Sequence, residues 1–323
     1  MSNEIFNIIK SDLANLEDAL HEAVKSPADT ITEIGNHLIK AGGKRLRPAL
    51  FFLAAHCDSN YNRERVMPLA VALELIHMAS LVHDDVLDSA STRRGAATAN
   101  AKWGNQLAIL AGDYLFAKAF AMVAEHNYGS RVELQLSRLL TDLSAGELIQ
   151  NKEIYKASCR VDEYFSRIAM KTANFLAISC QLGGDMAKLS EEDIQALYDY
   201  GYCVGVAFQL TDDLLDITGD TKTIGKPAGN DILQGIITLP AIRALEVTPH
   251  RDELLSIVTN PTMSRDMLNR ALELVRATDG GEFTKGKVEE YLNKAKGSLP
   301  ESIPMEIRNT YYMAADFISG REF

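Results

Sequence analysis

The sequence has little of what marks several classes of protein. Its 4 Cys are widely spaced among 323 residues, which indicates neither a disulfide framework nor a zinc site. A net charge of −11 disfavours a general nucleic-acid-binding surface. The chain begins without a cleavable apolar segment, and no uninterrupted apolar run approaches the roughly 20 residues of a membrane span. We therefore expect a cytoplasmic protein with reduced thiols.

Proline is scarce and strand signals are weak. The chain has only 9 Pro, and long stretches rich in Ala, Leu, Glu and Lys favour helix. Few segments alternate with the period of a strand. The breaks between helical stretches are short, except for one near residues 219–240 that is long enough for a functional loop. We predict an all-α protein in which residues 1–323 form one domain.

A matched pair of acidic clusters is the strongest feature that is present. Residues 84–88 read Asp-Asp-Val-Leu-Asp and residues 212–216 read Asp-Asp-Leu-Leu-Asp, each within an apolar stretch. On a helix the first and fifth positions share a face, so each cluster can aim two carboxylates at one point. Two solvated acidic helix ends are the alternative for either cluster alone.

The expected helices make these clusters unfavourable without a cation. We predict one helix over residues 66–90 and a second that begins at Ser190 and runs towards Asp216. Both clusters then lie near helix C-termini, where the helix dipole disfavours negative charge. Mg²⁺ prefers oxygen ligands and leaves positions for substrate phosphates. The clusters therefore indicate metal-assisted chemistry on a phosphate or diphosphate.

Basic residues accompany the acidic clusters. Residues 42–48 read Gly-Gly-Lys-Arg-Leu-Arg-Pro, which suits a phosphate clamp or, equally, a basic surface turn. A second pair, Arg93 and Arg94, follows the first cluster closely. Further candidates, each also consistent with an ordinary surface position, are Lys171, Thr172, Gln209 and Lys226.

In this order the motifs resemble those of the trans-type polyprenyl diphosphate synthases, and the resemblance covers nearly the whole chain. It implies the isoprenoid synthase fold, a single all-α bundle of core helices around a deep central cavity. It also implies Mg²⁺ as cofactor, with three ions bound and Mn²⁺ as a substitute. The implied metal ligands are Asp84, Asp85, Asp88, Asp212, Asp213 and Asp216.

The resemblance also implies how substrates are bound. Lys44, Arg47, His77 and Arg94 would hold isopentenyl diphosphate. The allylic diphosphate would be held through the metal ions by Asp84, Asp88 and Asp212, with help from Arg93, Lys171 and Lys226. The carbonyl groups of Lys171 and Thr172 and the side chain of Gln209 would face the allylic cation. The implied catalytic residues are thus these last three with Asp84, Asp85, Asp88, Asp212 and Asp213.

Small residues before the first cluster indicate a long product. Ala79, Ser80 and, one turn deeper, Ile76 lie on the helix that leads into Asp84, and each turn adds about 5.4 Å of depth. The resemblance implies elongation of farnesyl diphosphate to an all-trans chain, most simply heptaprenyl diphosphate for the side chain of menaquinone. Farnesyl, geranylgeranyl, hexaprenyl and octaprenyl products remain alternatives.

One segment departs from the pattern of many homomeric relatives. Ile236 stands where they often carry Lys, and its side chain cannot bind diphosphate ionically. Residues 225–240 and 75–85 are most similar to the catalytic large subunit of two-component heptaprenyl diphosphate synthases. We therefore expect a small non-catalytic partner subunit, with a homodimer as the alternative. Any contact with a membrane would be transient and would occur through the product.

Three other function classes compete with this interpretation. A metal phosphohydrolase could use His77 and His83 with Asp84, but it has no need of the second cluster. A terpene cyclase also ionises a diphosphate, but it does not need the cations Lys44 and Arg47. A non-catalytic subunit would be expected to have lost carboxylates, whereas both clusters are complete.

Overall fold

The computed structural model describes residues 5–156, 160–219 and 228–320. These residues form two compact units, each assembled from segments that are separate in the chain. Unit 1 comprises the residues up to Leu140 with Ile178–Tyr198 and Pro300–Tyr311, and unit 2 comprises Thr141–Ala177, Asp199–Leu299 and the residues from Tyr312. The prediction of one domain over residues 1–323 stays a prediction.

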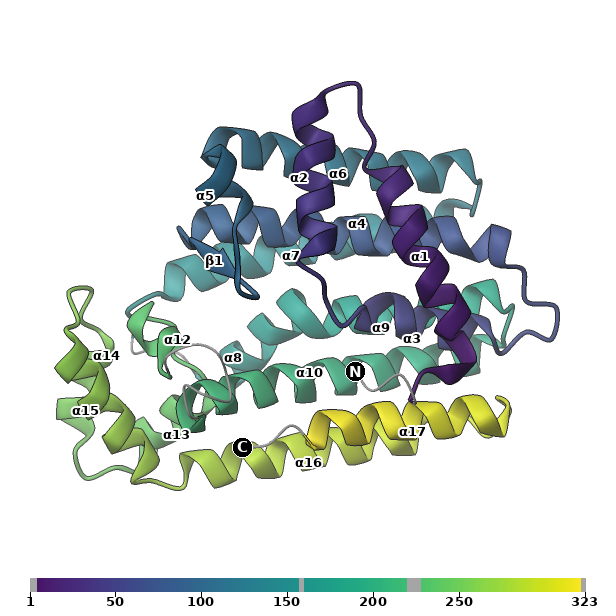
Figure 1. Ribbon diagram of the computed structural model, residues 1–323. Coiled ribbons are helices and arrows are strands. Elements are labelled where there is room, and N and C mark those ends of the chain that lie inside the picture. Colours follow the sequence, from purple (N-terminus) through teal and green to yellow (C-terminus); the bar gives the residue numbers. More distant parts are fainter. Residues whose placement is uncertain (1–4, 157–159, 220–227, 321–323) are drawn as a thin grey trace. The chain divides into compact units, whose positions relative to one another are not determined.

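Helices make up nearly all the regular structure of the described residues, which confirms the all-α class (Figure 1). Those of unit 1 are η1 Asn7–Ile9, α1 Lys10–Ala23, α2 Asp29–Lys40, α3 Leu46–Ala55, α4 Arg63–Leu87, α5 Ala99–Trp103 and α6 Asn105–Glu125. Helices with residues in both units are α7 Ser130–Glu153, α9 Asn174–Met186, α10 Glu191–Thr218 and α17 Met305–Ser319.

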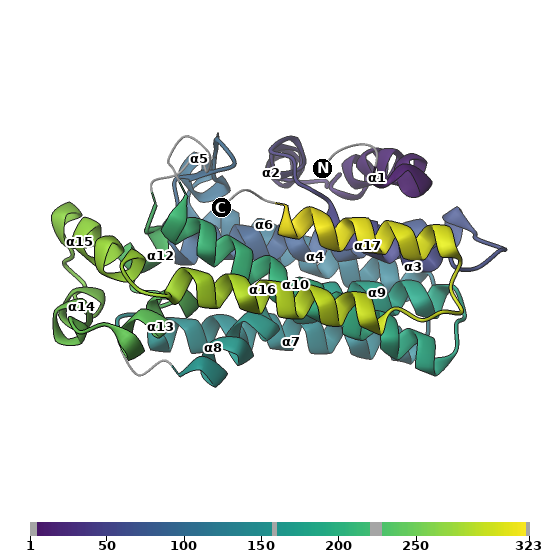
Figure 2. The same ribbon diagram turned by 90° about the horizontal axis from the view of Figure 1, so that it is seen from below.

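Unit 2 adds shorter helices: α8 Val161–Ile168, the π-helical turn η2 Ala169–Ala173, α12 Asn230–Leu233, α13 Leu239–Val247, α14 Arg251–Val258, α15 Arg265–Arg276 and α16 Gly280–Ser298. Helix α13 packs against α14, α15 and α16 (Figure 2). Helix α10 begins after Ser190, whose hydroxyl accepts a hydrogen bond from the Asp193 N–H at 3.1 Å. The predicted long helix from Ser190 through the second acidic cluster is therefore confirmed.

Helix α4 is the central helix of unit 1, and it confirms the helix predicted over residues 66–90. It begins after Asn62, whose side chain accepts a hydrogen bond from the Arg65 N–H, and it lies beside α6 (Figure 1). Apolar side chains are buried around its whole circumference, including Leu75, Ile76 and Ala79 at 0% exposure. A helix that is apolar all round belongs in a protein core.

Helices α4 and α6 are long and apolar enough to cross a membrane by length and composition alone. Neither helix is an uninterrupted apolar run, because α4 contains Glu74 and α6 contains Asp113. In α4, 67% of the apolar window is buried inside the protein, as expected of a core helix, whereas in α6 only 33% is buried. The outward apolar face of α6 therefore needs a separate explanation.

A short hairpin follows α4 and was not predicted. Strands β1 Thr92–Arg93 and β2 Ala96–Ala97 pair antiparallel, with Arg93 opposite Ala96. The two turn residues, Arg94 and Gly95, have φ angles of 52° and 78°, and positive φ at both positions is what a type I′ hairpin turn requires. Strands of two residues are too short to show alternation, so sequence periodicity could not reveal them.

The π-helical turn η2 interrupts the helical path between α8 and α9. The N–H of Asn174 bonds to the carbonyl of Ala169, five residues earlier, instead of the usual four. Helix α10 approaches this turn closely at Gly205, where an added Cβ would lie 2.5 Å from Ala173 Cα. Glycine is therefore required at residue 205.

We predict that Gly205→Ala destabilises the protein by about 1–3 kcal/mol, because the backbone of η2 must move to admit the methyl group. Gly286→Ala in α16 is the matched control, since nothing lies within 4 Å of its added Cβ. The control should be neutral or should stabilise by about 0.5–1 kcal/mol. Thermal unfolding measures both variants, and equal melting temperatures would contradict the close approach.

Candidate active site

The first acidic cluster lies at the C-terminal end of α4, as predicted. The helix ends at Leu87, and the N–H of the capping residue Asp88 donates to the Asp84 carbonyl at 2.8 Å. Asp84 is half-buried and Asp88 is exposed. Because the helix dipole is negative at this end, a cation beside the two carboxylates would be stabilising.

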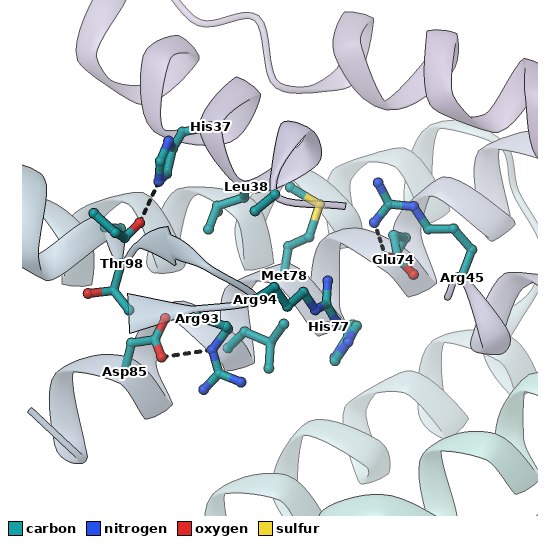
Figure 3. A pocket seen from close by; sticks show the side chains of 14 residues that line it. His37, Leu38, Arg45, Glu74, His77, Met78, Asp85, Arg93, Arg94 and Thr98 are labelled. Atoms are coloured by element: carbon teal, nitrogen blue, oxygen red, sulfur yellow. Dashed lines mark hydrogen bonds and ion pairs between the residues drawn. The ribbon is translucent and has the colours of Figure 1, made fainter. Parts of the chain in front are cut away.

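Asp85 has a different environment from its neighbours. It is 1% exposed and accepts a hydrogen bond from Arg93 Nε at 2.8 Å (Figure 3). Its backbone carbonyl accepts from the Asn100 side chain at 3.2 Å. Asp85 therefore joins α4 to the hairpin, and it holds Arg93 next to the first cluster.

The predicted diphosphate clamp is brought together within unit 1. Arg47 Nη1 donates to His77 Nε2 at 3.1 Å, and the Arg94 guanidinium donates to the Gly42 carbonyl. Lys44 is half-buried in the segment between Gly43 and α3. Residues 42–48 and the hairpin turn thus lie together, although the sequence separates them.

Burial and neighbouring charges tune the clamp. Burial lowers the pKa of Arg47, Glu74 opposes this change and Arg94 adds to it, and the resulting pKa is about 10. Burial and then the charge of Arg47 hold the pKa of His77 well below its ordinary value. His77 is therefore neutral, accepts at Nε2 and carries its N–H on Nδ1.

The second cluster is embedded in a hydrogen-bonded chain within unit 2. The Thr172 hydroxyl donates to Gln209 Oε1 at 2.9 Å, and Gln209 Nε2 donates to Asp213 Oδ1 at 2.8 Å. Tyr164 on α8 donates its hydroxyl to Asp213 Oδ2 at 2.5 Å. The structure thus brings three predicted residues together, and it adds Tyr164, which sequence reasoning missed.

Asp213 is 3% exposed, and its titration reflects that burial. Burial raises the pKa of Asp213, the hydrogen bonds from Tyr164 and Gln209 oppose this change, the charge of Asp212 adds to it, and the resulting pKa is about 6. Because this pKa is raised, protonation of Asp213 stabilises the metal-free protein, and that contribution is lost as the pH rises through about 6. A nearby cation would offset the loss.

The other carboxylates of unit 2 have their own partners. The two oxygens of Asp216 accept from the backbone N–H groups of Asn230 and Asp231, both at 3.1 Å. Burial raises the pKa of Asp231 well above its ordinary value, as do the charges of Asp216 and Asp213. Asp231 therefore adds a further acidic group beside the cluster. Asp212 is half-buried at the same end of α10.

Lys171 and Thr172 both lie in the π-helical turn η2. Lys171 Nζ lies 2.6 Å from Glu147 Oε2 on α7, a partner that sequence reasoning missed. A π turn redirects backbone carbonyl groups and is frequent at functional sites, which is consistent with the predicted role of the Lys171 and Thr172 carbonyls. Lys226, the remaining predicted cation, lies outside the described residues.

The predicted chain-length residues lie on α4 before the first cluster. Ala79 and Ile76 are fully buried, whereas Ser80 is half-buried and its hydroxyl donates to the His77 carbonyl at 2.9 Å. The small size of Ala79 is the feature that matters for the prediction. Its contact with a growing product stays a prediction.

Comparison with known proteins decides the family. The polyprenyl synthetase family model matches residues 28–275. The chain belongs to the polyprenyl synthetase family. Heptaprenyl diphosphate synthase component 2 of Geobacillus stearothermophilus is 39% identical over 320 residues, which cover 99% of this chain and 98% of that protein.

Two further relatives give context for the synthase. Octaprenyl diphosphate synthase of Escherichia coli is 33% identical over 298 residues, which cover 92% of this chain and 91% of that protein. A solved polyprenyl synthase from Caulobacter crescentus, in complex with calcium and isoprenyl diphosphate, superimposes with a TM-score of 0.92 at 33% identity, covering 98% and 97% of the two chains. These similarities show that the chain has the isoprenoid synthase fold and is a trans-prenyl diphosphate synthase. They do not determine the length of its product.

Prenyl synthases generally use Mg²⁺, and the donor atoms of this chain fit that ion. The candidate ligands are carboxylate oxygens, the type that hard cations prefer. Within residues 5–156, 160–219 and 228–320, no three carboxylate, imidazole or thiol side chains form a ready-made metal site.

The environment of the histidines argues against a phosphohydrolase. His83 Nε2 donates to the Ile109 carbonyl at 3.1 Å, so this nitrogen is not available to a metal. The His83 ring lies where a Cβ at Gly112 would stand, and it packs edge-on against Phe116. His77 pairs with Arg47 instead. Neither Nε2 atom is therefore open to a metal, and among the described residues the two histidines form no three-ligand group with Asp84.

Tyr164, Glu147 and Glu74 are the site residues that sequence reasoning missed. Tyr164 and Glu147 belong to helices other than those of the groups they contact, and Glu74 lies on α4 but pairs with Arg45, 29 residues earlier. A carboxylate or tyrosine among apolar neighbours is the only signal, and this signal is common in helical proteins. Tertiary packing was needed to find them.

We predict that Tyr164→Phe moves the acid limb of the kcat/KM profile of the synthase to higher pH. Loss of the hydroxyl removes a bond that lowers the pKa of Asp213, so Asp213 becomes protonated at a pH above about 6. A lost hydrogen bond to a charged group corresponds to about 1.5–3 kcal/mol. Tyr128→Phe, which removes only a bond to the Arg65 carbonyl, should leave the profile unchanged. Identical profiles for both variants would contradict this role of Tyr164.

Proposed function

We propose that this synthase elongates farnesyl diphosphate with successive isopentenyl diphosphate units to an all-trans long-chain product, heptaprenyl diphosphate. The observation that carries the proposal is the pairing of complete carboxylate clusters with cationic groups within each unit. In unit 1, Arg47, His77 and Arg94 accompany Asp84 and Asp88. In unit 2, Lys171 and η2 accompany the second cluster.

The two diphosphates call for different binding groups. Lys44, Arg47 and Arg94 supply cations to isopentenyl diphosphate, and the neutral His77 supplies an N–H donor from Nδ1. Asp84, Asp88 and Asp212 would hold the allylic diphosphate through Mg²⁺, with help from Arg93 and Lys171. The further ligands of Mg²⁺ would be Asp85, Asp213 and Asp216. Bound Mg²⁺ would neutralise charge on the leaving diphosphate.

Ionisation of the allylic diphosphate leaves a carbocation that must be protected. The carbonyl groups of Lys171 and Thr172 present partial negative charge to it, and Gln209 is fixed with its Oε1 towards Thr172. The double bond of isopentenyl diphosphate attacks the cation. Loss of a proton to the departing diphosphate then gives a chain longer by one isoprene unit, so no protein nucleophile is required.

A partner chain would cover the apolar face of α6. Leu107, Ile109 and Leu110 on this helix are 41%, 42% and 53% exposed, so a row of large apolar side chains is open to a partner. Such a patch commonly marks a protein interface. The relative from Geobacillus stearothermophilus is named as component 2. We therefore propose a small non-catalytic subunit as partner, with a homodimer of this chain as the alternative.

The product and its use are part of the same proposal. Small residues at Ala79 and Ser80 leave room for a long chain, and the name of the 39% identical relative favours heptaprenyl. The heptaprenyl group of the product would then become the side chain of menaquinone. The enzyme would work in the cytoplasm, where its product would bring it briefly to a membrane.

One assay tests the activity. The purified chain is incubated with Mg²⁺, farnesyl diphosphate and labelled isopentenyl diphosphate, with and without cell extract that supplies a partner, and the products are sized. Heptaprenyl diphosphate, formed mainly when extract is present, is the expected result. Full long-chain activity of the chain alone would favour the homodimer. Release of diphosphate without elongation would contradict the proposed function.

We predict that Ala79→Tyr shortens the product in this assay. Ala79 is fully buried on α4, one turn before Asp84, so an aromatic ring there would close the space below the first cluster. Ala79→Ser is the matched control and should keep the long product, because Ser adds only a hydroxyl group. An Ala79→Tyr variant that melts normally and makes the wild-type product would refute the chain-length assignment.

A further inference from the structure

Arg45 begins α3 in an unfavourable backbone conformation. Its φ of 48° and ψ of 34° lie in the left-handed region, which costs a non-glycine residue roughly 1–2 kcal/mol. It stands between Lys44 and Arg47, the two cations of the clamp. A strained residue persists where the surrounding structure holds it in place, so its contacts are informative.

The Arg45 side chain is buried and forms ion pairs with two helices. Its Nε and Nη2 donate to the two oxygens of Glu17 on α1 at 2.6 and 2.9 Å. Its Nη1 donates to Glu74 Oε1 on α4 at 2.6 Å (Figure 3). Burial alone would lower the pKa of Arg45, but Glu17 and Glu74 raise it above its ordinary value. Arg45 is therefore charged and held on both sides.

Glu74 is the most deeply buried member of this cluster, at 3% exposure. Arg45 occupies its Oε1, while its Oε2 has no hydrogen-bond partner among the described residues. Glu74 lines a cavity together with His77 and Arg94, and this cavity admits water. A carboxylate repels a diphosphate, so Glu74 must act through its cationic neighbours.

We propose that the Arg45–Glu74 pair, supported by Glu17, is a positioning device for the isopentenyl diphosphate site. The inference rests on the function proposed above, in which Lys44 and Arg47 bind that substrate. By holding Arg45 in its left-handed turn, the pair fixes the backbone between the two cations. The substrate then meets donors in one arrangement, and it does not have to order a flexible diglycine segment.

Glu74 also balances charge in the clamp. Arg45, Arg47 and Arg94 place three cations near one another, and Glu74 is a buried anion that acts on all three. Asp84 on α4 is the other anion that acts on Arg47. Without the charge of Glu74, mutual repulsion would spread the cations apart before the diphosphate arrives.

Glu74→Gln and Glu17→Gln test the proposal, since each removes a charge and keeps the side-chain shape. Glu74→Gln should raise the KM for isopentenyl diphosphate by about tenfold, while kcat and the KM for the allylic diphosphate stay near their wild-type values. Glu17→Gln should act in the same direction but less strongly. The Glu17 side chain is 42% exposed, so this variant is expected to fold even if Glu74→Gln does not.

Asp12→Asn is the matched control within unit 1. Asp12 is a buried carboxylate on α1 that accepts hydrogen bonds from His56, Tyr61 and Arg63. None of these three hydrogen bonds involves residues 42–48. This variant should lower the melting temperature without changing either KM. If the Glu74 and Glu17 variants likewise lose only stability and kcat, the positioning role is overturned.

Calorimetric titration of isopentenyl diphosphate into the intact protein separates this inference from the proposed function. Dissociation constants about tenfold weaker in Glu74→Gln than in wild type support positioning, even if wild type fails to elongate. Equal constants with normal elongation overturn positioning and leave the proposed function intact. A wild-type protein that neither binds isopentenyl diphosphate nor elongates overturns both.

Discussion

Carboxylates at the C-terminal ends of two helices are the constraint on which the rest of the site depends. Negative charge at this end of a helix is unfavourable, and burial of part of each cluster adds to the cost. The structure divides each cluster in the same way. The second aspartate, Asp85 or Asp213, is buried and held by protein donors, while the first, Asp84 or Asp212, stays partly exposed. The two clusters thus share one arrangement of a buried and a partly exposed aspartate.

The donors that hold the buried aspartates also connect the clusters to the groups that act on substrate. In unit 1, Asp85 fixes Arg93, and the hairpin that carries Arg93 also carries Arg94 to the clamp. In unit 2, Asp213 orients Gln209, which in turn accepts from Thr172 in the π-helical turn. A change at either buried aspartate therefore reaches both the metal ligands and the substrate groups.

The position of both acidic clusters and the family of the protein could be predicted from the sequence. Helical periodicity and the dipole argument placed both clusters at helix ends, and the order of the motifs indicated the family. The hairpin could not be predicted from the sequence, because its strands have only two residues each. The π turn depends on the close approach of Gly205, and the partners of Asp213 and Arg45 come from helices elsewhere in the chain. Such pairings are fixed by tertiary packing, so neither composition nor spacing reveals them.

The central proposal is that Mg²⁺ held by these carboxylates would complete its coordination with substrate diphosphate, because Mg²⁺ prefers oxygen ligands and usually keeps positions for phosphate and water. Calorimetric titration of inorganic pyrophosphate into the protein, with saturating Mg²⁺ and again in EDTA, tests it most directly, together with a titration of Mg²⁺ alone. We expect one tight pyrophosphate site that requires Mg²⁺, in addition to metal-independent binding at the cationic clamp, and weak binding of Mg²⁺ alone. Tight binding of Mg²⁺ without pyrophosphate, or equal pyrophosphate affinity in EDTA, would contradict it.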